Sequence, residues 1–179
     1  IGEIDPIVTH YLRGNSDIDN HKKYEEPLKG NNGFELLEVG VRPVGGKYTD
    51  LTRVSDEVEI VIRYRLSQPH ENFWITMHMK NEQGERMFST TGKGRFYQAK
   101  HEVGEYEQIC YLPKNFFNWG AYSLDLLAIS KPSNIEWLLI ESDIVSFTLA
   151  NRPIEIGGWM GREPGDITPI FKYIEKRFG

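Results

Sequence analysis

The sequence predicts an all-β domain, an antiparallel sandwich of two sheets, and three observations lead to this prediction. Within residues 57–66 every second residue is apolar, which is the period of a strand with one buried face. Similar short runs recur after residue 33 and are separated by turn residues such as Gly45-Gly46 and Glu82-Gln83-Gly84. Aromatic residues make up 12% of the chain, and because each can bury about 150–250 Å² they can supply a core.

The N-terminal residues show a different pattern from the rest of the chain. Residues 1–14 predict a short helix, because Asp5 can cap it, Pro6 can occupy its first position, and apolar residues follow at helical spacing. Residues 15–32 are polar and charged, so we expect a linker there. Since the chain begins at Ile1 without a methionine, we expect it to be a fragment whose preceding domain lies upstream.

Residues 33–179 are expected to form the sandwich domain. Seven strands are predicted, in chain order 34–41, 57–66, 73–80, 86–90, 106–112, 121–129 and 144–149. Little helix is expected between them, so neighbouring strands should pair antiparallel. A glycine-rich loop, 157–165, and a mixed tail, 167–178, follow the last strand.

Composition and charge argue against several classes of protein. The net charge is -5, and the densest basic patch holds only Lys93, Arg95 and Lys100, so we expect no nucleic-acid partner. No apolar run reaches the roughly 18 residues of a membrane span, and no secretory signal is evident. The single cysteine, Cys110, allows no internal disulfide, so we expect a buried thiol in a reducing, cytoplasmic setting.

Motifs for catalysis and for cofactor binding are missing from the sequence. We find no Walker loop, no Gly-x-Ser-x-Gly elbow and no His-Glu-x-x-His pair, and the five histidines are dispersed. We therefore expect no catalytic residue, no cofactor and no metal. One enzymatic alternative stays open, glycoside hydrolysis by carboxylates drawn from Glu57, Glu59 and Asp125, although most such residues on strands belong to a solvated face.

The strand 73–80 has the chemistry that best suits a binding site, since its outward positions hold Trp74, Thr76, His78 and Lys80. An indole can stack on the apolar face of a sugar ring, and an imidazole can donate or accept a hydrogen bond. We expect Arg63 and Arg65, on the neighbouring strand, to add donors suited to a carboxylate or phosphate on a glycan. The plainer alternative is that Trp74 packs beneath a loop and His78 is an ordinary surface residue.

Two further aromatic residues are predicted in exposed loops, Tyr97 and Trp119. Loops at the end of a sandwich often hold binding residues, and they also cover the open ends of the core, so both roles remain possible. We include Tyr97 and Trp119 in the candidate carbohydrate-binding site with Trp74, His78, Arg63 and Arg65.

The order of several motifs is similar to that of a known family. The stretches are 58–64, 79–84, 111–117, 120–124, 143–147 and the tail from Gly161-Arg162-Glu163-Pro164-Gly165 to Pro169. Over residues 33–170 the chain resembles the C-terminal domain of the ATPase subunit of O-antigen polysaccharide ABC transporters, the Wzt type. Residues 4–12 are similar to the last helix of the ATPase domain in that family, which agrees with a fragment.

The resemblance implies an immunoglobulin-like sandwich that binds the non-reducing, often capped end of a finished glycan without catalysis. Binding would select the glycan for export by a membrane-spanning partner at the inner face of the inner membrane. The resemblance also implies a homodimer that exchanges a C-terminal strand, for which residues 167–178 are the candidate within a segment of about 150–179. A second hypothesis is a dimerisation or docking domain that does not recognise sugar.

Overall fold

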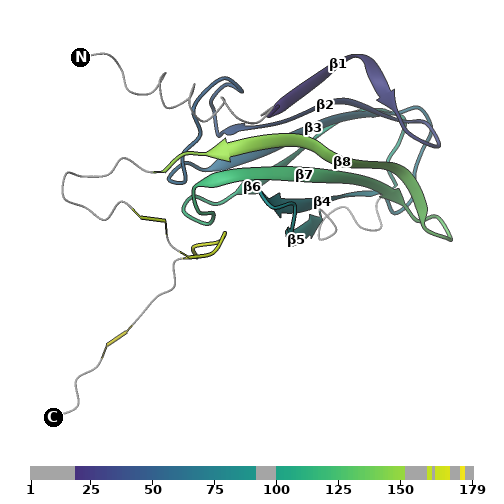
Figure 1. The fold of residues 1–179 in the computed structure, drawn as a ribbon. Coiled ribbons are helices and arrows are strands. Elements are labelled where there is room, and N and C mark those ends of the chain that lie inside the picture. Colours follow the sequence, from purple (N-terminus) through teal and green to yellow (C-terminus); the bar gives the residue numbers. More distant parts are fainter. Residues whose placement is uncertain (1–18, 92–99, 152–160, 163, 170–173, 176–179) are drawn as a thin grey trace.

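The computed structural model describes residues 19–91, 100–151, 161–162, 164–169 and 174–175. Eight strands form the domain (Figure 1): β1 (His21–Lys29), β2 (Phe34–Pro43), β3 (Val58–Leu66), β4 (Trp74–Asn81), β5 (Arg86–Thr91), β6 (Gly104–Leu112), β7 (Gly120–Ser130) and β8 (Glu136–Leu149). All seven predicted strands are present. Among the described residues no helix has the length and apolarity that crossing a membrane requires.

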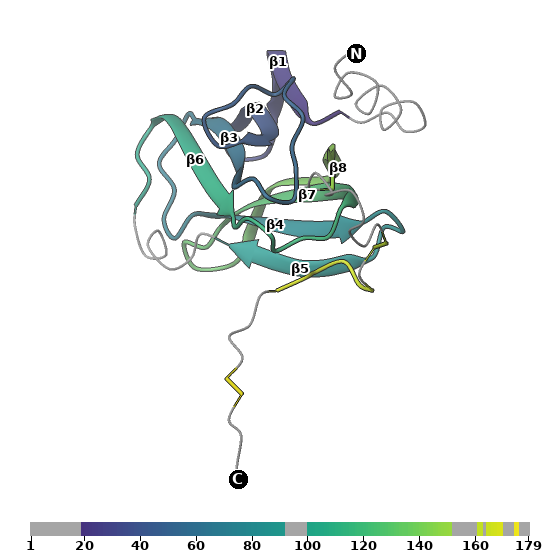
Figure 2. The ribbon, with the colours of Figure 1, turned by 90° about the vertical axis from the view of Figure 1, so that its left-hand side faces the viewer.

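The strands form two antiparallel sheets of four, in the orders β1-β2-β3-β6 and β5-β4-β7-β8. Figure 2 shows the two sheets as separate layers, with β6, β3 and β2 above β4 and β5. This arrangement confirms the predicted two-sheet sandwich. For the sections below we call the sheet β1-β2-β3-β6 the first sheet and β5-β4-β7-β8 the second sheet.

The core lies between the sheets and is built from the alternate apolar residues that the sequence pattern marked. On β3 the inward residues Ile60 and Ile62 are fully buried, and on β4 Ile75 and Met77 are equally shielded. Stacked and tilted aromatic rings fill one end of the core, where Phe34 contacts Tyr64 of β3 and Phe73, which directly precedes β4. Because inward and outward positions alternate, the residues between these core positions must form the outer faces.

Strand β1 corrects the expectation that residues 15–32 form a linker. His21–Lys29 pair antiparallel with β2, although the segment is mostly polar. An edge strand needs few apolar residues, and here Tyr24 and Leu28 pack against the core. The residues that looked like the end of a linker form the turn into β2, where Gly33 adopts φ 73°. The predicted helix of residues 1–14 lies outside the described residues.

Strand β8 is longer than the sequence pattern predicts. It begins at Glu136 instead of 144, and its pairing with β7 shifts register between Leu124 and Leu126 and again between Ala128 and Ile129. These bulges interrupt the alternation, so the first half of β8 carries no period-2 signal. Asp143 lies beside one of the shifts with φ 49°, a left-handed conformation that Asp and Asn tolerate better than most residues.

Candidate functional site

The outer face of the second sheet brings together the outward residues of four strands, and we call it the β4 face. Cross-strand pairing defines its rows: Lys80 lies opposite Ser123, His78 opposite Asp125, and Trp74 opposite Ile129. Polar residues therefore occupy the end of the face near Lys80, whereas apolar residues occupy the end near Trp74. This division into a polar and an apolar end is the main feature of the site.

The polar end is organised by Lys80, whose ammonium group contacts two carboxylates. Its Nζ lies 2.6 Å from Asp125 Oδ1 and 2.7 Å from Asp143 Oδ1. The backbone N–H of Asp143 also donates to Asp125 Oδ1 at 2.9 Å, so the turn in β8 is tied to β7. The Asp143 side chain remains 61% exposed, whereas the side chains of Lys80 and Asp125 are largely shielded. We call these three residues the lysine cluster.

Hydrogen bonds within the lysine cluster shift the pKa of two of its members. Burial alone would lower the pKa of Lys80, but its hydrogen bonds to Asp125 and Asp143 raise that pKa above its ordinary value. The hydrogen bond from Lys80, followed by one from Ser123, lowers the pKa of Asp143. The cluster therefore holds one cation and an exposed carboxylate at neutral pH, and Asp143 presents an acceptor to solvent.

His78 lies next to the lysine cluster and is half-buried. Its Nδ1 is 2.7 Å from Ser89 Oγ on β5. Burial, and then the nearby positive charges of Arg86 and Lys80, lower the pKa of His78 below its usual value of 6.5. The imidazole is consequently neutral at pH 7 and can act as both a donor and an acceptor. The predicted placement of His78 on an outward polar surface is correct.

Trp74 occupies the predicted face, but the expectation that its ring is available to a ligand is wrong. Its relative exposure is only 6%, and Ile129 opposite it is equally shielded. The structure thus favours the alternative in which Trp74 is a packed residue. Period-2 alternation distinguishes the two faces of a strand, but it does not show whether other parts of the chain cover an outward side chain.

The sequence reasoning missed the exposed aromatic residue of this face, Trp137. It lies on β8 opposite Ile129 and is 47% exposed, and Ile140, opposite the half-buried Leu127, is 58% exposed. Both positions fall in the part of β8 that the bulge conceals. We call Leu127, Trp137 and Ile140 the apolar platform. The sequence does place this tryptophan between polar loop residues and an apolar run. Using that signal would have required predicting that β8 begins before residue 144.

Arg63 and Arg65 do not join this site, which corrects the expectation that β3 neighbours β4. Strand β3 belongs to the first sheet and pairs with β2 and β6. Both arginines are on the outer face of the first sheet and have carboxylate partners there. Arg63 lies 3.5 Å from Glu38, and Arg65 lies 2.7 Å from Glu105. The two outer faces point in opposite directions, so no ligand can contact Arg63 and His78 together.

The same separation removes the pairing of Asp125 with Glu59 that was considered for hydrolysis. Glu59 is on the first sheet and forms an ion pair with Arg42 at 2.7 Å, whereas Asp125 is on the second sheet. The two carboxylates cannot flank one glycosidic bond. Among the described residues, no group of three or more His, Cys, Asp or Glu side chains is placed to hold a metal ion.

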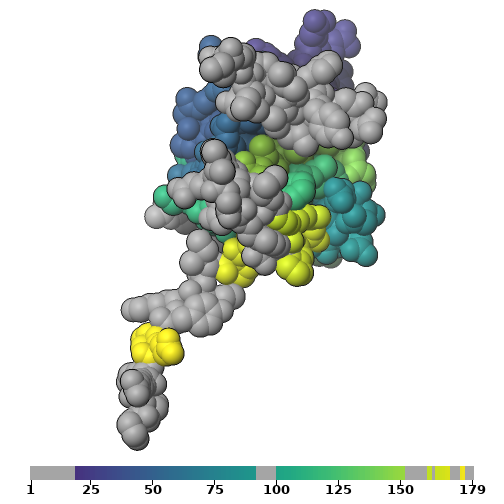
Figure 3. Space-filling view, turned by 60° about the vertical axis from the view of Figure 1, so that its left-hand side comes forward, coloured from purple at the N-terminus to yellow at the C-terminus, as the bar shows by residue number. Residues whose placement is uncertain are grey.

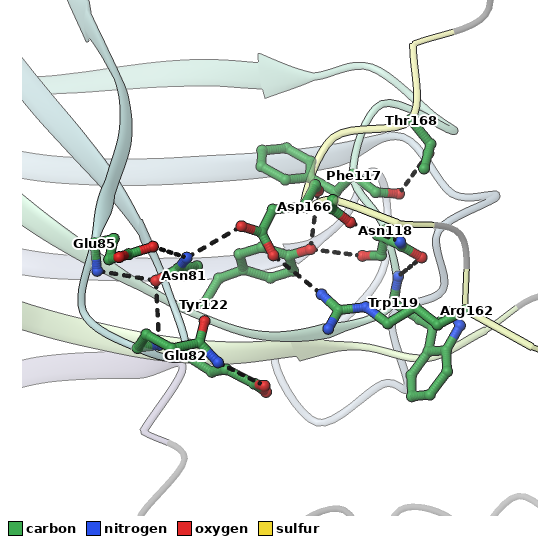
Figure 4. Close-up of polar contacts among 12 residues, drawn as sticks. Asn81, Glu82, Glu85, Phe117, Asn118, Trp119, Tyr122, Arg162, Asp166 and Thr168 are labelled. Carbon is green, nitrogen blue, oxygen red and sulfur yellow. Dashed lines mark hydrogen bonds and ion pairs between the residues drawn. The ribbon is translucent and has the colours of Figure 1, made fainter.

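Trp119 directly precedes β7, at the end of the sandwich where the tail docks. Its ring is half-buried beneath Arg162, whose guanidinium carbon is 5.8 Å from the ring centroid. Figure 4 shows both side chains in the network around Asp166. The expectation of an exposed loop aromatic is therefore not met for Trp119, and Tyr97 lies outside the described residues.

The tail residues 161–162 and 164–169 are held by a hydrogen-bonded network with Asp166 at its centre (Figure 4). The Asp166 carboxylate accepts from Arg162 and from Asn81 Nδ2, each at 3.1 Å, and its carbonyl accepts from the backbone N–H of Asn118 at 2.9 Å and from the hydroxyl of Tyr122 at 3.2 Å. In Figure 3 the yellow atoms that lie against the body of the domain belong to this part of the tail. This docked tail borders the polar end of the β4 face, next to the β4–β5 turn.

Comparison with known proteins finds a solved structure of similar fold. No family model and no curated protein sequence matches the chain. Among solved structures, the chain is similar to the C-terminal domain of Wzt, with a TM-score of 0.62 and 13% sequence identity over 90% of this chain and 95% of that one. The similarity confirms the predicted resemblance in fold.

Proposed function

We propose that this domain is a non-catalytic carbohydrate-binding module that recognises the non-reducing, capped end of an O-antigen polysaccharide. One observation above all supports the proposal: the β4 face presents an exposed tryptophan, Trp137, on the same surface as the exposed carboxylate of Asp143. The likeness in fold to the C-terminal domain of Wzt agrees with it.

The chemistry of the face suits a neutral glycan. Trp137 offers a ring for the apolar side of a pyranose, while Asp143 can accept and neutral His78 can exchange hydrogen bonds with hydroxyl groups. The central cation, Lys80, is already neutralised by two carboxylates. A phosphate or carboxylate on the ligand would therefore meet Asp125 and Asp143 as like charges, so we expect sugars without such groups to bind more tightly.

The remaining parts of the proposal concern the assembly. We propose that the domain is part of an ABC-transporter ATPase at the cytoplasmic side of the inner membrane. It forms a homodimer in which the C-terminal segment is exchanged, and it works with a membrane-spanning partner. Binding of the glycan end would select completed chains for export. No cofactor is required, since the proposed recognition uses only side chains of the β4 face.

Calorimetric titration with the source organism's O-polysaccharide, both capped and end-trimmed, tests this function. We expect saturable binding of the capped form with a dissociation constant in the micromolar to millimolar range, about -4 to -8 kcal/mol. Trp137→Ala should weaken it at least tenfold. Tyr111→Ala is the matched control, because Tyr111 is an aromatic residue of similar exposure on the opposite outer face, and it should leave binding unchanged.

A docking role is the second candidate, and exposed apolar residues on edge strand β6 favour it. Ile109 and Tyr111 are 36% and 56% exposed on the outer face of the first sheet. If the domain serves only in assembly, no glycan will bind, and Tyr111→Ala will change the sedimentation coefficient of the protein. Glycan binding with sedimentation unaffected by Tyr111→Ala would exclude this alternative.

A further inference from the structure

We infer that the β4 face binds a run of consecutive sugar residues, with the terminal sugar at the lysine cluster and the following sugars across the apolar platform. This inference rests on the proposed function and specifies the length and the direction of the ligand. It depends on three features of the described residues: the spacing of the two ends of the face, their different chemistry, and their different surroundings.

The spacing follows from the register of the second sheet. Asp125 marks the polar end on β7, and Ile129, which lies opposite Trp137, marks the apolar end four residues further along the same strand. At about 3.3 Å per residue the separation is roughly 13 Å. A single pyranose ring cannot contact both Asp143 and Trp137 over this distance, whereas a short oligosaccharide can. Ile140, opposite Leu127, lies between the two ends.

The chemistry of the two ends is complementary to different parts of a glycan. At the polar end, Asp143, His78 and Ser89 offer hydrogen-bonding groups, which suit the hydroxyl groups that a capped terminal sugar retains. At the apolar end the exposed surface is contributed by Trp137 and Ile140, which suit the flat, less polar sides of sugars within a chain. The platform residues Leu127, Trp137 and Ile140 are uncharged, so an uncharged polymer can lie across them without burying an unpaired ion.

The surroundings of the two ends give the direction. The polar end is bordered by the β4–β5 turn and the docked tail, which are joined by the hydrogen bond from Asn81 to Asp166. The platform end is continued by the β7–β8 turn, in which residues 131–135 are all exposed. A chain terminus can therefore lie at the bordered end, while the rest of the polymer leaves over the exposed turn.

The inference is tested by calorimetry with fragments of one to five sugars that retain the non-reducing end of the same O-polysaccharide, sized by gel filtration. For the wild-type domain we expect affinity to rise about tenfold from one sugar to three and then level off. In Trp137→Ala the one-sugar fragment should bind as before, while the gain with length disappears. In Asp143→Asn every fragment should bind more weakly, because a neutral amide oxygen accepts a weaker hydrogen bond from the terminal sugar than the carboxylate does.

Three outcomes separate this inference from the proposed function. Equal affinity for one sugar and for five would overturn the extended site but leave carbohydrate binding intact. Equal loss of affinity for all fragments in Trp137→Ala would place the terminal sugar on the platform and refute the direction. Absence of binding by any fragment, with the melting temperature unchanged, would refute the proposed function itself. Tyr111→Ala serves as the folded control throughout, and sedimentation of Trp137→Ala shows whether a second copy of the chain covers the platform instead.

Discussion

At the scale of single residues, the lysine cluster is the part of the β4 face where removal of one group should cost the most stability. Replacing Lys80 by Met leaves the shielded carboxylate of Asp125 without its ion-pair partner. We expect a loss of about 1–3 kcal/mol in the free energy of unfolding, measured by urea denaturation.

Lys100→Met is the matched control for that measurement. Lys100 forms an ion pair of similar length, 2.9 Å to Glu102, but both side chains are more than half exposed. Exposed pairs contribute little, so the loss should stay below about 1 kcal/mol. If Lys80→Met and Lys100→Met lower the free energy of unfolding by the same amount, the shielding of the lysine cluster does not increase the contribution of its ion pairs to stability.

The lowered pKa of Asp143 predicts a dependence of stability on pH. A carboxyl group whose pKa is lower in the folded than in the unfolded state stabilises the fold above its unfolded value of about 3.9, and this stabilisation disappears as the pH falls through the folded pKa. The stability difference between wild type and Asp143→Asn should therefore be constant from pH 7 to pH 5 and shrink below pH 4. Asn tolerates the left-handed backbone at this position, so the substitution should add no backbone strain of its own.

The pH prediction has an internal control. Because the hydrogen bond from Lys80 is the leading cause of the shift, adding Asp143→Asn to Lys80→Met should largely remove the pH-dependent difference. Urea denaturation midpoints measured across the same pH range test this expectation. If the pH-dependent stability difference persists unchanged without Lys80, groups other than Lys80 lower the pKa of Asp143.

Residue-level prediction from the sequence succeeded for side chains whose role depends only on strand period. His78 and Lys80 are outward, and Ile75 and Met77 are buried, as alternation requires. Prediction failed where exposure depends on distant parts of the chain. Trp74 is shielded despite its outward position, because burial is set by tertiary packing and not by period.

At the scale of elements, the docked tail is held by several hydrogen bonds to the domain, and the Asp166 side chain joins it to both Asn81 and Arg162. Asp166→Ala removes the acceptors for Arg162 and Asn81 and should let residues 161–169 leave the domain more often. Limited trypsin digestion followed by mass spectrometry should then show cleavage after Arg162 severalfold faster than in wild type. Glu175→Ala, an exposed acidic position of the same tail, should not change that rate.

The positions of the strands could be predicted because most of them follow one unbroken period. Strand β3 matches its expected bounds to within one residue, as an uninterrupted half-buried strand should. Strand β8 was only half predicted because two bulges interrupt its alternation. The same bulges place Trp137 and Asp143 on the β4 face, so the residues most relevant to binding were the ones that the periodic pattern concealed.

At the scale of the whole molecule, sandwich architecture was predictable and the assignment of strands to sheets was not. Two consecutive strands can form a hairpin in one sheet or belong to different sheets, and the connection from β3 to β4 crosses from the first sheet to the second. The prediction that Arg63 and His78 share one surface required β3 and β4 to be neighbours in one sheet. Local patterns do not contain this choice, which is decided by how the two sheets close around a common core.

The first sheet needs β1 to be complete, which gives a prediction about the limits of the domain. A chain beginning at residue 33 would expose the hydrogen-bonding edge of β2 and lose the packing of Tyr24 and Leu28 against the core. It would also lose the stacking of His21 on Tyr48, whose ring centroids are 3.7 Å apart. We expect a loss of roughly 2–4 kcal/mol from the two apolar side chains alone.

Calorimetric melting of chains that begin at residue 19 and at residue 33 measures this loss. For a domain of this size about 1 kcal/mol corresponds to roughly 2–4 °C, so the shorter chain should melt roughly 5–15 °C lower and aggregate more readily. The longer chain should melt at the temperature of the full sequence if the sandwich begins with β1. Equal melting temperatures for the two shortened chains would mean that β1 contributes nothing to the fold and that residues 15–32 act as a linker after all.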